Sequence, residues 1–169
     1  TYHPSVGFID LGTIPGYGTE GLGINDRGEI SGVVTRTGGQ ASFVYAPGTG
    51  FTILGDFGGQ EVNAGTQISA SGVVAGTIES ADGRFQAYRY SASSGVQHLG
   101  TLGGDNSRGY AINDIGWVVG TSQTGDGTWH AFLYRDDMGM VDLGPGYASG
   151  INNLGLAAGI SDGQPVLFR

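Results

Sequence analysis

One short phrase recurs four times along the chain, and this repetition constrains the fold more than any other feature of the sequence. The phrase has the general form Ile-Asn-Asp-x-Gly followed by small or apolar residues and another glycine, and its isoleucines are Ile24, Ile68, Ile112 and Ile151. Successive copies are therefore 44, 44 and 39 residues apart. Self-similarity with a period of this length is typical of solenoids and propellers. We expect four similar structural units.

Two further phrases accompany each copy. A Leu-Gly pair precedes the isoleucine phrase, within residues 10–12, 53–55, 98–100 and 142–144. A segment in which aromatic residues alternate with others follows it, at residues 40–45, 86–90, 130–134 and 164–168. Alternation with a period of two indicates β-strands, and Asn-Asp-x-Gly suits a tight hairpin turn. Each copy therefore predicts four short antiparallel strands, about the size of one propeller blade.

The order of the phrases predicts how the units are divided. One domain is expected over residues 1–169, with repeat units at about 13–54, 55–99, 100–143 and 144–169. The fourth unit reaches Arg169 after only three strands, and residues 8–12 have the pattern of the missing fourth strand. We therefore predict a small, all-β, propeller-like ring of four blades, in which residues 1–12 complete the last blade and close the ring. An open solenoid with capped ends is the alternative.

Glycine makes up 35 of the 169 residues, and its placement supports the same fold. Interior glycine destabilises helices by roughly 1 kcal/mol relative to alanine, which excludes a helical protein. Small residues stand three positions before each isoleucine, at Gly21, Gly65, Gly109 and Ala148. This pattern is expected if the first strand of every blade lies next to a crowded central axis. The absence of cysteine excludes disulfides and thiolate metal sites.

The chain is acidic, which narrows the class of partner. It has 15 Asp and Glu residues against 7 Lys and Arg, a net charge of −8. Nucleic-acid binding depends on cations that neutralise phosphates, so we expect no nucleic-acid partner. No apolar run approaches the ~20 residues that span a bilayer, so no membrane span is expected. We expect a monomer.

The third copy of the phrases shows a resemblance to a known family. It contains His-Leu-Gly-Thr-Leu-Gly-Gly at residues 98–104, Ala-Ile-Asn-Asp at 111–114 and His-Ala-Phe at 130–132. These phrases resemble the bacterial HAF extracellular repeat family, named after the last tripeptide, and the resemblance covers nearly the whole chain from Gly7 to Arg169. In the other copies the tripeptide is Gln-Ala-Ser, Gln-Ala-Tyr or Gln-Pro-Val. The resemblance implies a secreted or cell-surface location in a bacterium, and it implies no catalytic residues.

The longer and more varied loops are expected on one face of the ring, where strand four leads to strand one and strand two leads to strand three. Binding residues concentrate on variable loops that a rigid scaffold holds. Aromatic rings that stack on sugar C–H groups, beside polar groups that orient hydroxyls, favour a carbohydrate or other polyhydroxyl ligand. The candidate binding residues are Tyr17, Asp105, Asn106, Arg108, Trp129 and Tyr147. The alternatives are a solvated acidic rim without a ligand and a purely structural spacer.

A glycan-active hydrolase or lyase is the second functional hypothesis. Paired carboxylates perform general acid–base work on glycosidic bonds, and the candidates on the same face are Glu20, Asp56, Glu61 and Asp105. They do not occupy equivalent repeat positions, and no Gly-x-Ser-x-Gly nucleophile motif occurs. The sequence leaves open whether the chain is an enzyme.

No cofactor is expected, and metal sites find little support. Zinc normally needs three or four converging ligands, whereas the chain has only His3, His98 and His130. Glutamine takes the place of His130 in the other copies, which favours a structural hydrogen bond. Asp82 and Asp126 lie in Asp-Gly turns that could hold calcium, but neither turn has the full EF-hand spacing. Asp-Gly is also the usual hairpin turn.

Overall fold

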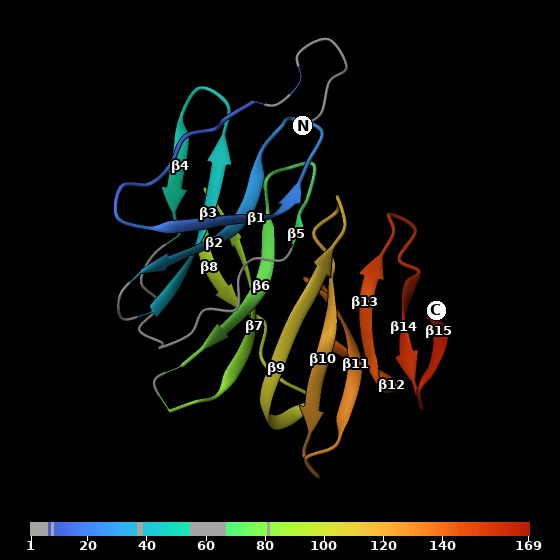
Figure 1. Ribbon diagram of the computed structural model, residues 1–169. Helices are drawn as coiled ribbons and strands as arrows, with labels where there is room; N and C mark the ends of the chain where they lie inside the picture. Colours follow the sequence, from blue (N-terminus) through green and yellow to red (C-terminus); the bar gives the residue numbers. More distant parts are fainter. Residues whose placement is uncertain (1–6, 8, 37–38, 55–66, 81) are drawn as a thin grey trace.

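The structure is a computed structural model that describes residues 7, 9–36, 39–54, 67–80 and 82–169. These residues form fifteen β-strands and no helix, and so none that is long and apolar enough to cross a membrane (Figure 1). The strands are β1 (Gly18–Ile24), β2 (Ile30–Arg36), β3 (Gly39–Ala46), β4 (Gly50–Ile53), β5 (Gln67–Ile68), β6 (Val74–Glu79), β7 (Phe85–Ser91), β8 (Gly95–His98), β9 (Gly103–Ile112), β10 (Val118–Thr124), β11 (Trp129–Arg135), β12 (Gly139–Pro145), β13 (Tyr147–Ile151), β14 (Ala157–Ser161) and β15 (Gln164–Phe168).

The strands form four antiparallel sheets, and each sheet is built from strands that are consecutive in the sequence (Figure 1). We call these sheets blades 1 to 4, and they consist of β1–β4, β5–β8, β9–β12 and β13–β15. The predicted all-β architecture of repeated antiparallel units is therefore confirmed. Blade 4 has three strands among the described residues, whereas the other blades have four.

The Ile-Asn-Asp-x-Gly phrase forms the hairpin turn between the first two strands of a blade. In blade 3 the Asn113 Oδ1 atom accepts a hydrogen bond from the Trp117 backbone N–H at 2.9 Å. Asn25 and Asn152 hold their own turns in the same way. The glycine that ends the phrase has a positive φ, 85° at Gly116. Glycine alone adopts this left-handed backbone without steric cost, which explains its place in the repeat.

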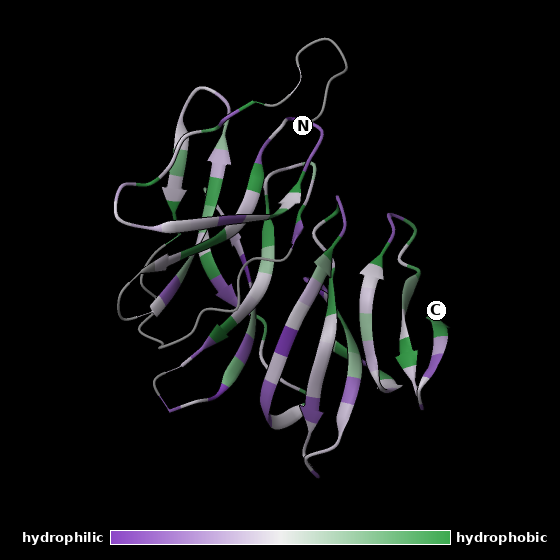
Figure 2. Ribbon diagram, viewed as in Figure 1, coloured by the Kyte–Doolittle hydropathy of each residue, from purple (hydrophilic) through white to green (hydrophobic). Residues whose placement is uncertain are grey.

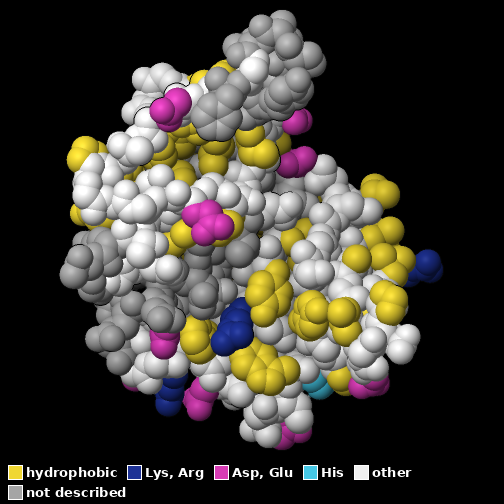
Figure 3. All heavy atoms as spheres, viewed as in Figure 1, with side chains coloured by type: hydrophobic (Ala, Val, Ile, Leu, Met, Phe, Trp, Pro, Cys, Tyr) yellow, Lys and Arg dark blue, Asp and Glu magenta, His cyan; other side chains and the backbone are white. Residues whose placement is uncertain are grey.

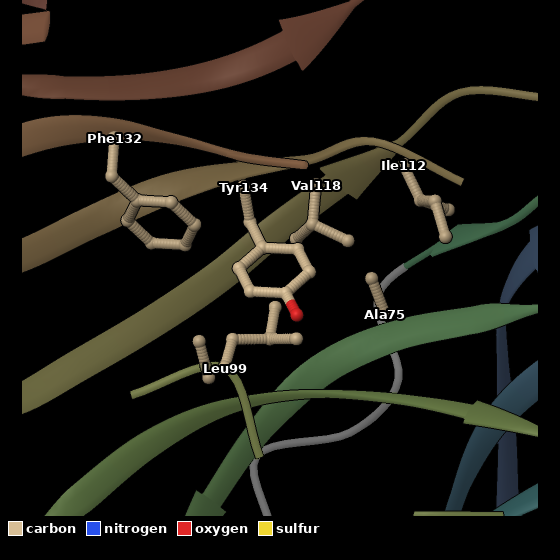
Figure 4. Packing of buried hydrophobic residues seen from close by; sticks show 7 residues of the cluster. Ala75, Leu99, Ile112, Val118, Phe132 and Tyr134 are labelled. Carbon is tan, nitrogen blue, oxygen red and sulfur yellow. The ribbon is translucent and has the colours of Figure 1, made fainter. Parts of the chain in front are cut away.

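Blades 2 and 3 each pack one face against the blade that follows. Ala75 and Leu99 of blade 2 contact Ile112, Phe132 and Tyr134 of blade 3, and Figure 4 shows this cluster between the two sheets. A similar cluster joins blades 3 and 4. Hydrophobic residues are accordingly spread over all four blades, and they alternate with polar ones along single strands (Figure 2). Removing apolar surface from water stabilises the fold by roughly 25 cal/mol per Å², and two of the three buried clusters are made by neighbouring blades together, whereas the third lies within blade 1.

Asparagine side chains also join successive blades, at the turn end of the first strands. The Asn25 Nδ2 group of blade 1 donates to the Ser69 carbonyl of blade 2 at 2.9 Å. Asn113 of blade 3 donates to the Asn152 carbonyl of blade 4 at 3.0 Å. Ser69 has no amide, so blades 2 and 3 lack this bond. Each asparagine thus holds its own turn with its oxygen and the next blade with its nitrogen.

A second set of hydrogen bonds connects the residues that follow these asparagines. The Ala70 N–H of blade 2 donates to Asp114 Oδ1 of blade 3 at 2.8 Å, and the Asp114 N–H donates to Asn153 Oδ1 of blade 4 at 3.0 Å. The Ala70 N–H and the Asn153 amide lower the pKa of Asp114 below its ordinary value. Asp26 of blade 1 lacks the equivalent acceptor, because Ala70 has no side-chain oxygen. We call the two sets together the inter-blade ladder.

The first strands of successive blades are neighbours, in agreement with the small residues found there. β5 contacts both β1 and β9, and β9 contacts β13. A close approach occurs at Gly109, where a Cβ atom would lie 2.7 Å from the Gly76 carbonyl oxygen of blade 2. Glycine at this position therefore allows β9 to lie against the preceding blade.

Closure of a four-blade ring is not confirmed. Among the described residues, 9–13 form no strand, and β15 pairs with β14 alone. In Figure 1 the segment before β1 lies at the left of the molecule and β13–β15 lie at the right. The four blades form an open series in this part of the chain. Residues 1–6 and 8, which belong to the predicted closing strand, lie outside the described residues.

Replacing Asn113 tests the inter-blade ladder. Asn113 is 4% exposed, and Asn113→Ala removes both its turn bond and its bond to blade 4. We expect the free energy of unfolding to fall by about 1–3 kcal/mol, because two hydrogen bonds of a buried side chain are lost and each contributes about 0.5–1.5 kcal/mol. Asn113→Ser is the matched control, since the Ser69 hydroxyl holds the equivalent turn, and it should lose about half as much in urea denaturation. A serine variant as stable as the original chain would contradict the inter-blade bond.

The same substitution at two glycines tests the packing of the first strands. In Gly109→Ala the methyl group would lie 2.7 Å from a carbonyl oxygen of blade 2, and we expect a loss of about 1–3 kcal/mol in unfolding free energy. In Gly125→Ala the nearest atom would be 3.9 Å away, so the thermal midpoint should change little. Equal midpoints for the two variants would show that β9 does not approach blade 2 closely.

Candidate functional site

A small cavity lies at the junction of blades 3 and 4, at the end of the strands opposite to the inter-blade ladder. Its volume is about 220 Å³, and its lining residues are Arg108, Tyr110, Thr121, Trp129, Gly146 and Tyr147. They come from β9, β10 and β11 of blade 3 and from the start of blade 4. Figure 3 shows hydrophobic side chains gathered around a basic side chain in the middle of this face.

Gly146 carries the chain from blade 3 to blade 4 at the edge of the cavity. The Thr121 hydroxyl donates to its carbonyl at 3.0 Å, and its own N–H donates to the Trp129 carbonyl at 3.1 Å. Its φ is 121°, and a Cβ atom there would lie 2.0 Å from the Ile160 carbonyl oxygen. Only glycine fits this position, and the connection fixes Trp129 and Tyr147 on either side of the cavity.

The Arg108 guanidinium lies between two aromatic rings. Its central carbon is 4.3 Å from the centroid of the Phe85 ring of blade 2 and 5.8 Å from the Trp129 ring. Cation–π contacts contribute roughly 0.5–2 kcal/mol each and orient the cation. The Nε–H group is buried without an acceptor. Among the described residues, the guanidinium makes no hydrogen bond and pairs with no carboxylate.

Arg89 shows how an arginine with a structural role is bound in this protein. Its guanidinium donates to Gln97 Oε1 at 2.7 Å, to the Gly116 carbonyl at 3.2 Å and to the Asp136 carboxylate. The bond to Gln97 lies within blade 2, whereas the other two join blade 2 to blade 3. Arg108 is held by rings instead, and its donors have no acceptor among the described residues.

Tyrosine and tryptophan rings form the rest of the wall. The rings of Tyr110 and Tyr147 meet edge to face, with their centroids 6.2 Å apart. Tyr147 and Trp129 are each 39% exposed, so both rings present surface to solvent. Exposed aromatic rings beside a few fixed polar groups are typical of a binding cavity. The described lining contains no carboxylate, although the whole chain has a net charge of −8.

Three of the six predicted binding residues, Arg108, Trp129 and Tyr147, come together in this cavity. Tyr17 lies elsewhere and packs against the buried cluster of blade 1. Asp105 lies in β9, where the sequence predicts a loop, and its carboxylate is 3.5 Å from the exposed Arg84 side chain. Neither Tyr17 nor Asp105 lines the cavity.

Asn106 also lies in β9, and its side chain connects strands. Its Oδ1 atom accepts a hydrogen bond from the Phe85 N–H at 2.8 Å, and its Nδ2 group donates to Gln123 Oε1 at 2.8 Å. These bonds hold β7 of blade 2 beside β9 and β10 of blade 3. Asn106 therefore positions the Phe85 backbone beneath Arg108 and does not itself line the cavity.

The four carboxylates predicted as catalytic candidates are not brought together in the described part of the chain. Glu20 lies in β1 of blade 1 and Asp105 in β9 of blade 3, and neither lines the cavity. Asp56 and Glu61 lie outside the described residues.

The acidic turns use their carboxylates to hold the backbone. The hydroxyls of Thr124 and Thr128 donate to Asp126 and lower its pKa to about 2. Asp82 accepts from the Ser80 hydroxyl and the Arg84 N–H in the same way. In the residues that the structure describes, no three His, Cys, Asp or Glu side chains are grouped as metal ligands would be.

His130 makes the structural hydrogen bond that the sequence predicts. Its Nδ1 atom lies 2.9 Å from the Asp142 carboxylate, which joins β11 to β12. His98 ends β8 in another blade, and His3 lies outside the described residues.

Phe85, Tyr110 and Thr121 were not among the residues predicted from the sequence. Phe85 occupies the same repeat position as Trp129, one residue before the Gln-Ala or His-Ala pair, and this equivalence could have identified it. Tyr110 stands where the pairing of β9 with β10 shifts by one residue. A bulge of this kind leaves no clear signal in the sequence.

No protein-family model matches the chain, and no curated protein matches it. A solved structure, TolB from Acinetobacter baumannii, is similar in fold, with a TM-score of 0.64 and 16% sequence identity. The match covers 93% of this chain and 41% of the TolB chain, so the chain spans less than half of that length. TolB has a β-propeller domain, and the similarity at this identity concerns the fold alone. The four-sheet chain thus has a propeller-like arrangement, and the resemblance to HAF repeats stays a prediction.

Proposed function

We propose that this chain is a binding module for a carbohydrate or other polyhydroxyl ligand that carries an acidic group, with the cavity around Arg108 as its binding site. One observation carries the proposal. The Arg108 guanidinium is fixed between the Phe85 and Trp129 rings, and it has no hydrogen-bond acceptor among the described residues. We also propose that the module is secreted or displayed on a bacterial surface, and the resemblance to HAF repeats supports this location.

The exposed rings supply the contact with the sugar. Trp129 and Tyr147 lie on either side of the cavity, and the C–H face of a pyranose ring can stack on such surfaces. The cavity volume is about 220 Å³, which is below the roughly 300–1,000 Å³ of sites that enclose a drug-sized ligand. This size suits one sugar unit or the end of a longer chain.

Arg108 favours an acidic group on that sugar. A guanidinium forms two parallel hydrogen bonds with a carboxylate, sulfate or phosphate group. Such bonds are stronger beside desolvating aromatic rings than in open water. No carboxylate in the described lining competes for the cation. Uronic acids and similar acidic sugars combine the ring faces and the anionic group that this cavity would recognise.

No contact at the cavity favours a glycan-active enzyme. Glycoside hydrolysis generally uses two carboxyl groups that flank the scissile bond, and the described lining has none. We therefore propose binding without turnover.

The two tryptophans separate ligand binding from packing. The centroid of the Trp117 ring lies 4.4 Å from the central carbon of the Arg135 guanidinium, and the ring lies close to Gly155 of blade 4. Trp129, in contrast, is 39% exposed at the cavity. Trp129→Ala should weaken binding of a galacturonate oligosaccharide about 30-fold, since truncating such an anchor costs about 2 kcal/mol, and its thermal midpoint should hardly change. Trp117→Ala should lower the midpoint and leave the affinity of the folded protein unchanged. Calorimetric titration that finds full affinity in Trp129→Ala would contradict the proposed site.

Arg108→Gln tests the acidic group. We expect affinity for galacturonate oligosaccharides to fall about 10–100-fold, because hydrogen bonds to charged groups contribute about 1.5–3 kcal/mol. Affinity for neutral galactose oligosaccharides should change little. Arg135→Gln is the control, since that arginine pairs with Asp137 outside the cavity. Equal losses for acidic and neutral sugars would show that Arg108 does not bind the acid, and release of new reducing ends by the original chain would favour the enzyme.

A further inference from the structure

Blade 4 leaves uncovered a sheet face that is buried in the blades before it. Ala75 of blade 2 and Val119 of blade 3 are 0% exposed, because the following blade packs on them. Ala158 occupies the same position in blade 4, and both Ala158 and Pro165 are exposed. Leu167, the cross-strand partner of Ala158, is 50% exposed. We call the surface of Ala158, Pro165 and Leu167 the open face; Figure 2 shows hydrophobic residues on its strands, β14 and β15.

Blade 1 leaves the complementary surface uncovered. Ile68 and Ile112 begin the isoleucine phrase in blades 2 and 3, and they are 5% and 3% exposed. Ile112 is buried because it packs on the preceding blade. Ile24 begins the phrase in blade 1 and is 52% exposed. The series of blades thus ends in two surfaces of the kinds that meet at each internal junction.

The inter-blade ladder is incomplete at the same two places. Asn113 and Asp114 of blade 3 donate to blade 4. The equivalent donors of blade 4 are the Asn152 side-chain Nδ2 group and the Asn153 backbone N–H, and they have no partner among the described residues. Asp114 also accepts a bond from the preceding blade. The equivalent Asp26 carboxylate of blade 1 accepts none in the described part of the chain. Among the described residues, blade 4 therefore has two ladder donors without an acceptor, and blade 1 has a ladder acceptor without a donor.

Blade 4 also has no fourth strand among the described residues, and residues 9–12 have the sequence of one and a turn hydrogen bond found at the end of a fourth strand. The Gly12 N–H donates to Asp10 Oδ1 at 2.9 Å, as the Gly144 N–H donates to Asp142 Oδ1 at 2.7 Å at the end of β12. Leu11 is 38% exposed, whereas the leucines of the same phrase in blades 1 and 2 are only 7% and 5% exposed. No described strand pairs with residues 9–12.

We propose that two copies of this chain complete each other. Residues 9–12 of one copy pair with β15 of the other as its fourth strand, and blade 1 of the first copy packs on the open face. The two contacts belong together, because at each internal junction the fourth strand of one blade is followed along the chain by the first strand of the next. Two chains joined head to tail in both directions close a ring of eight blades, within the 4–8 usual for propellers.

A second copy accounts for these surfaces better than closure within one chain. The segment before β1 and the strands of blade 4 lie on opposite sides of the molecule in Figure 1. The match to TolB takes in 41% of that chain, which is consistent with four blades that form an arc of a wider ring. An uncovered apolar face and an unpaired edge strand favour association. The proposal therefore replaces the monomer that we expect from the sequence.

Cysteine cross-linking tests the exchanged strand, because the chain has no cysteine of its own. In blade 3, Val141 of the fourth strand pairs with Leu133 of the third, so Ile9 and Leu167 should be cross-strand neighbours. The Cα atoms of such pairs are about 4.5–5.5 Å apart, which a disulfide spans. Ile9→Cys and Leu167→Cys proteins, mixed and oxidised, should give a disulfide-linked dimer on a non-reducing gel.

The control and the competing outcomes are distinct. Met138 is 58% exposed in a turn of blade 3, so Met138→Cys mixed with Ile9→Cys should give no linked dimer. A chain with both Ile9→Cys and Leu167→Cys should also form linked dimers. An intrachain disulfide in a monomer would show closure within one chain and overturn the proposal. Sedimentation of the unmodified chain should give twice the chain mass, and a monomer at every concentration would overturn it as well.

A charge on the open face provides a second test. Leu167→Glu should convert the dimer to a folded monomer, because Leu167 is already half exposed within one copy. Met138→Glu, at a similarly exposed leucine-sized side chain away from the open face, should stay dimeric. A Leu167→Glu protein that remains dimeric would contradict the proposed surface. Sugar binding should survive in this monomer, because the Arg108 cavity lies within one copy, so failure of one proposal would be distinguishable from failure of the other.

Discussion

The contact between one blade and the next is the interaction on which the rest of this structure depends. A single repeat unit cannot bury its hydrophobic face by itself, and the cluster that contains Phe132 and Tyr134 draws its residues from two blades. The inter-blade ladder adds direction to this packing. An asparagine such as Asn113 accepts from its own turn and donates forward to the next blade. The blades therefore follow one another in one order and at one spacing.

The candidate binding site is a consequence of the same arrangement. Blades 3 and 4 are joined by both sets of ladder bonds, and Gly146 closes the connection between them. The residue four positions before the isoleucine of each repeat is Glu20, Ala64, Arg108 or Tyr147. Framework residues recur at their positions in the repeat, whereas this position changes its chemistry from blade to blade. The chemistry of the candidate site therefore comes from side chains at a repeat position that the fold does not restrict to one residue type.

The period of the isoleucine phrase was sufficient to predict an all-β chain of four units, because a turn and its flanking strands are encoded locally. Arg108, Trp129 and Tyr147 were also predicted, as aromatic and basic residues on the face that carries the variable loops, although Arg108 lies within β9. The sequence could not show that Asn106 connects strands and does not line the cavity, because its partners Phe85 and Gln123 are 21 and 17 residues away. Ring closure could not be predicted from the repeated phrases. The pattern of residues 8–12 predicts a fourth strand, but it does not say which copy of the chain that strand completes.

Assembly and ligand binding affect each other through symmetry. Two chains that alternate head to tail around one ring axis present their loop ends on the same side, so both Arg108 cavities would face one way. Each cavity is made within a single copy, and it would keep its affinity for a single sugar unit. A polymer of acidic sugars could occupy both cavities at once. The second contact would then be intramolecular, and its effective concentration would raise avidity by about 10²–10⁴ without any new interaction. Dimerisation through the uncovered face of blade 4 would thus raise the avidity of the Arg108 cavities for such a polymer, because two cavities would bind it at once.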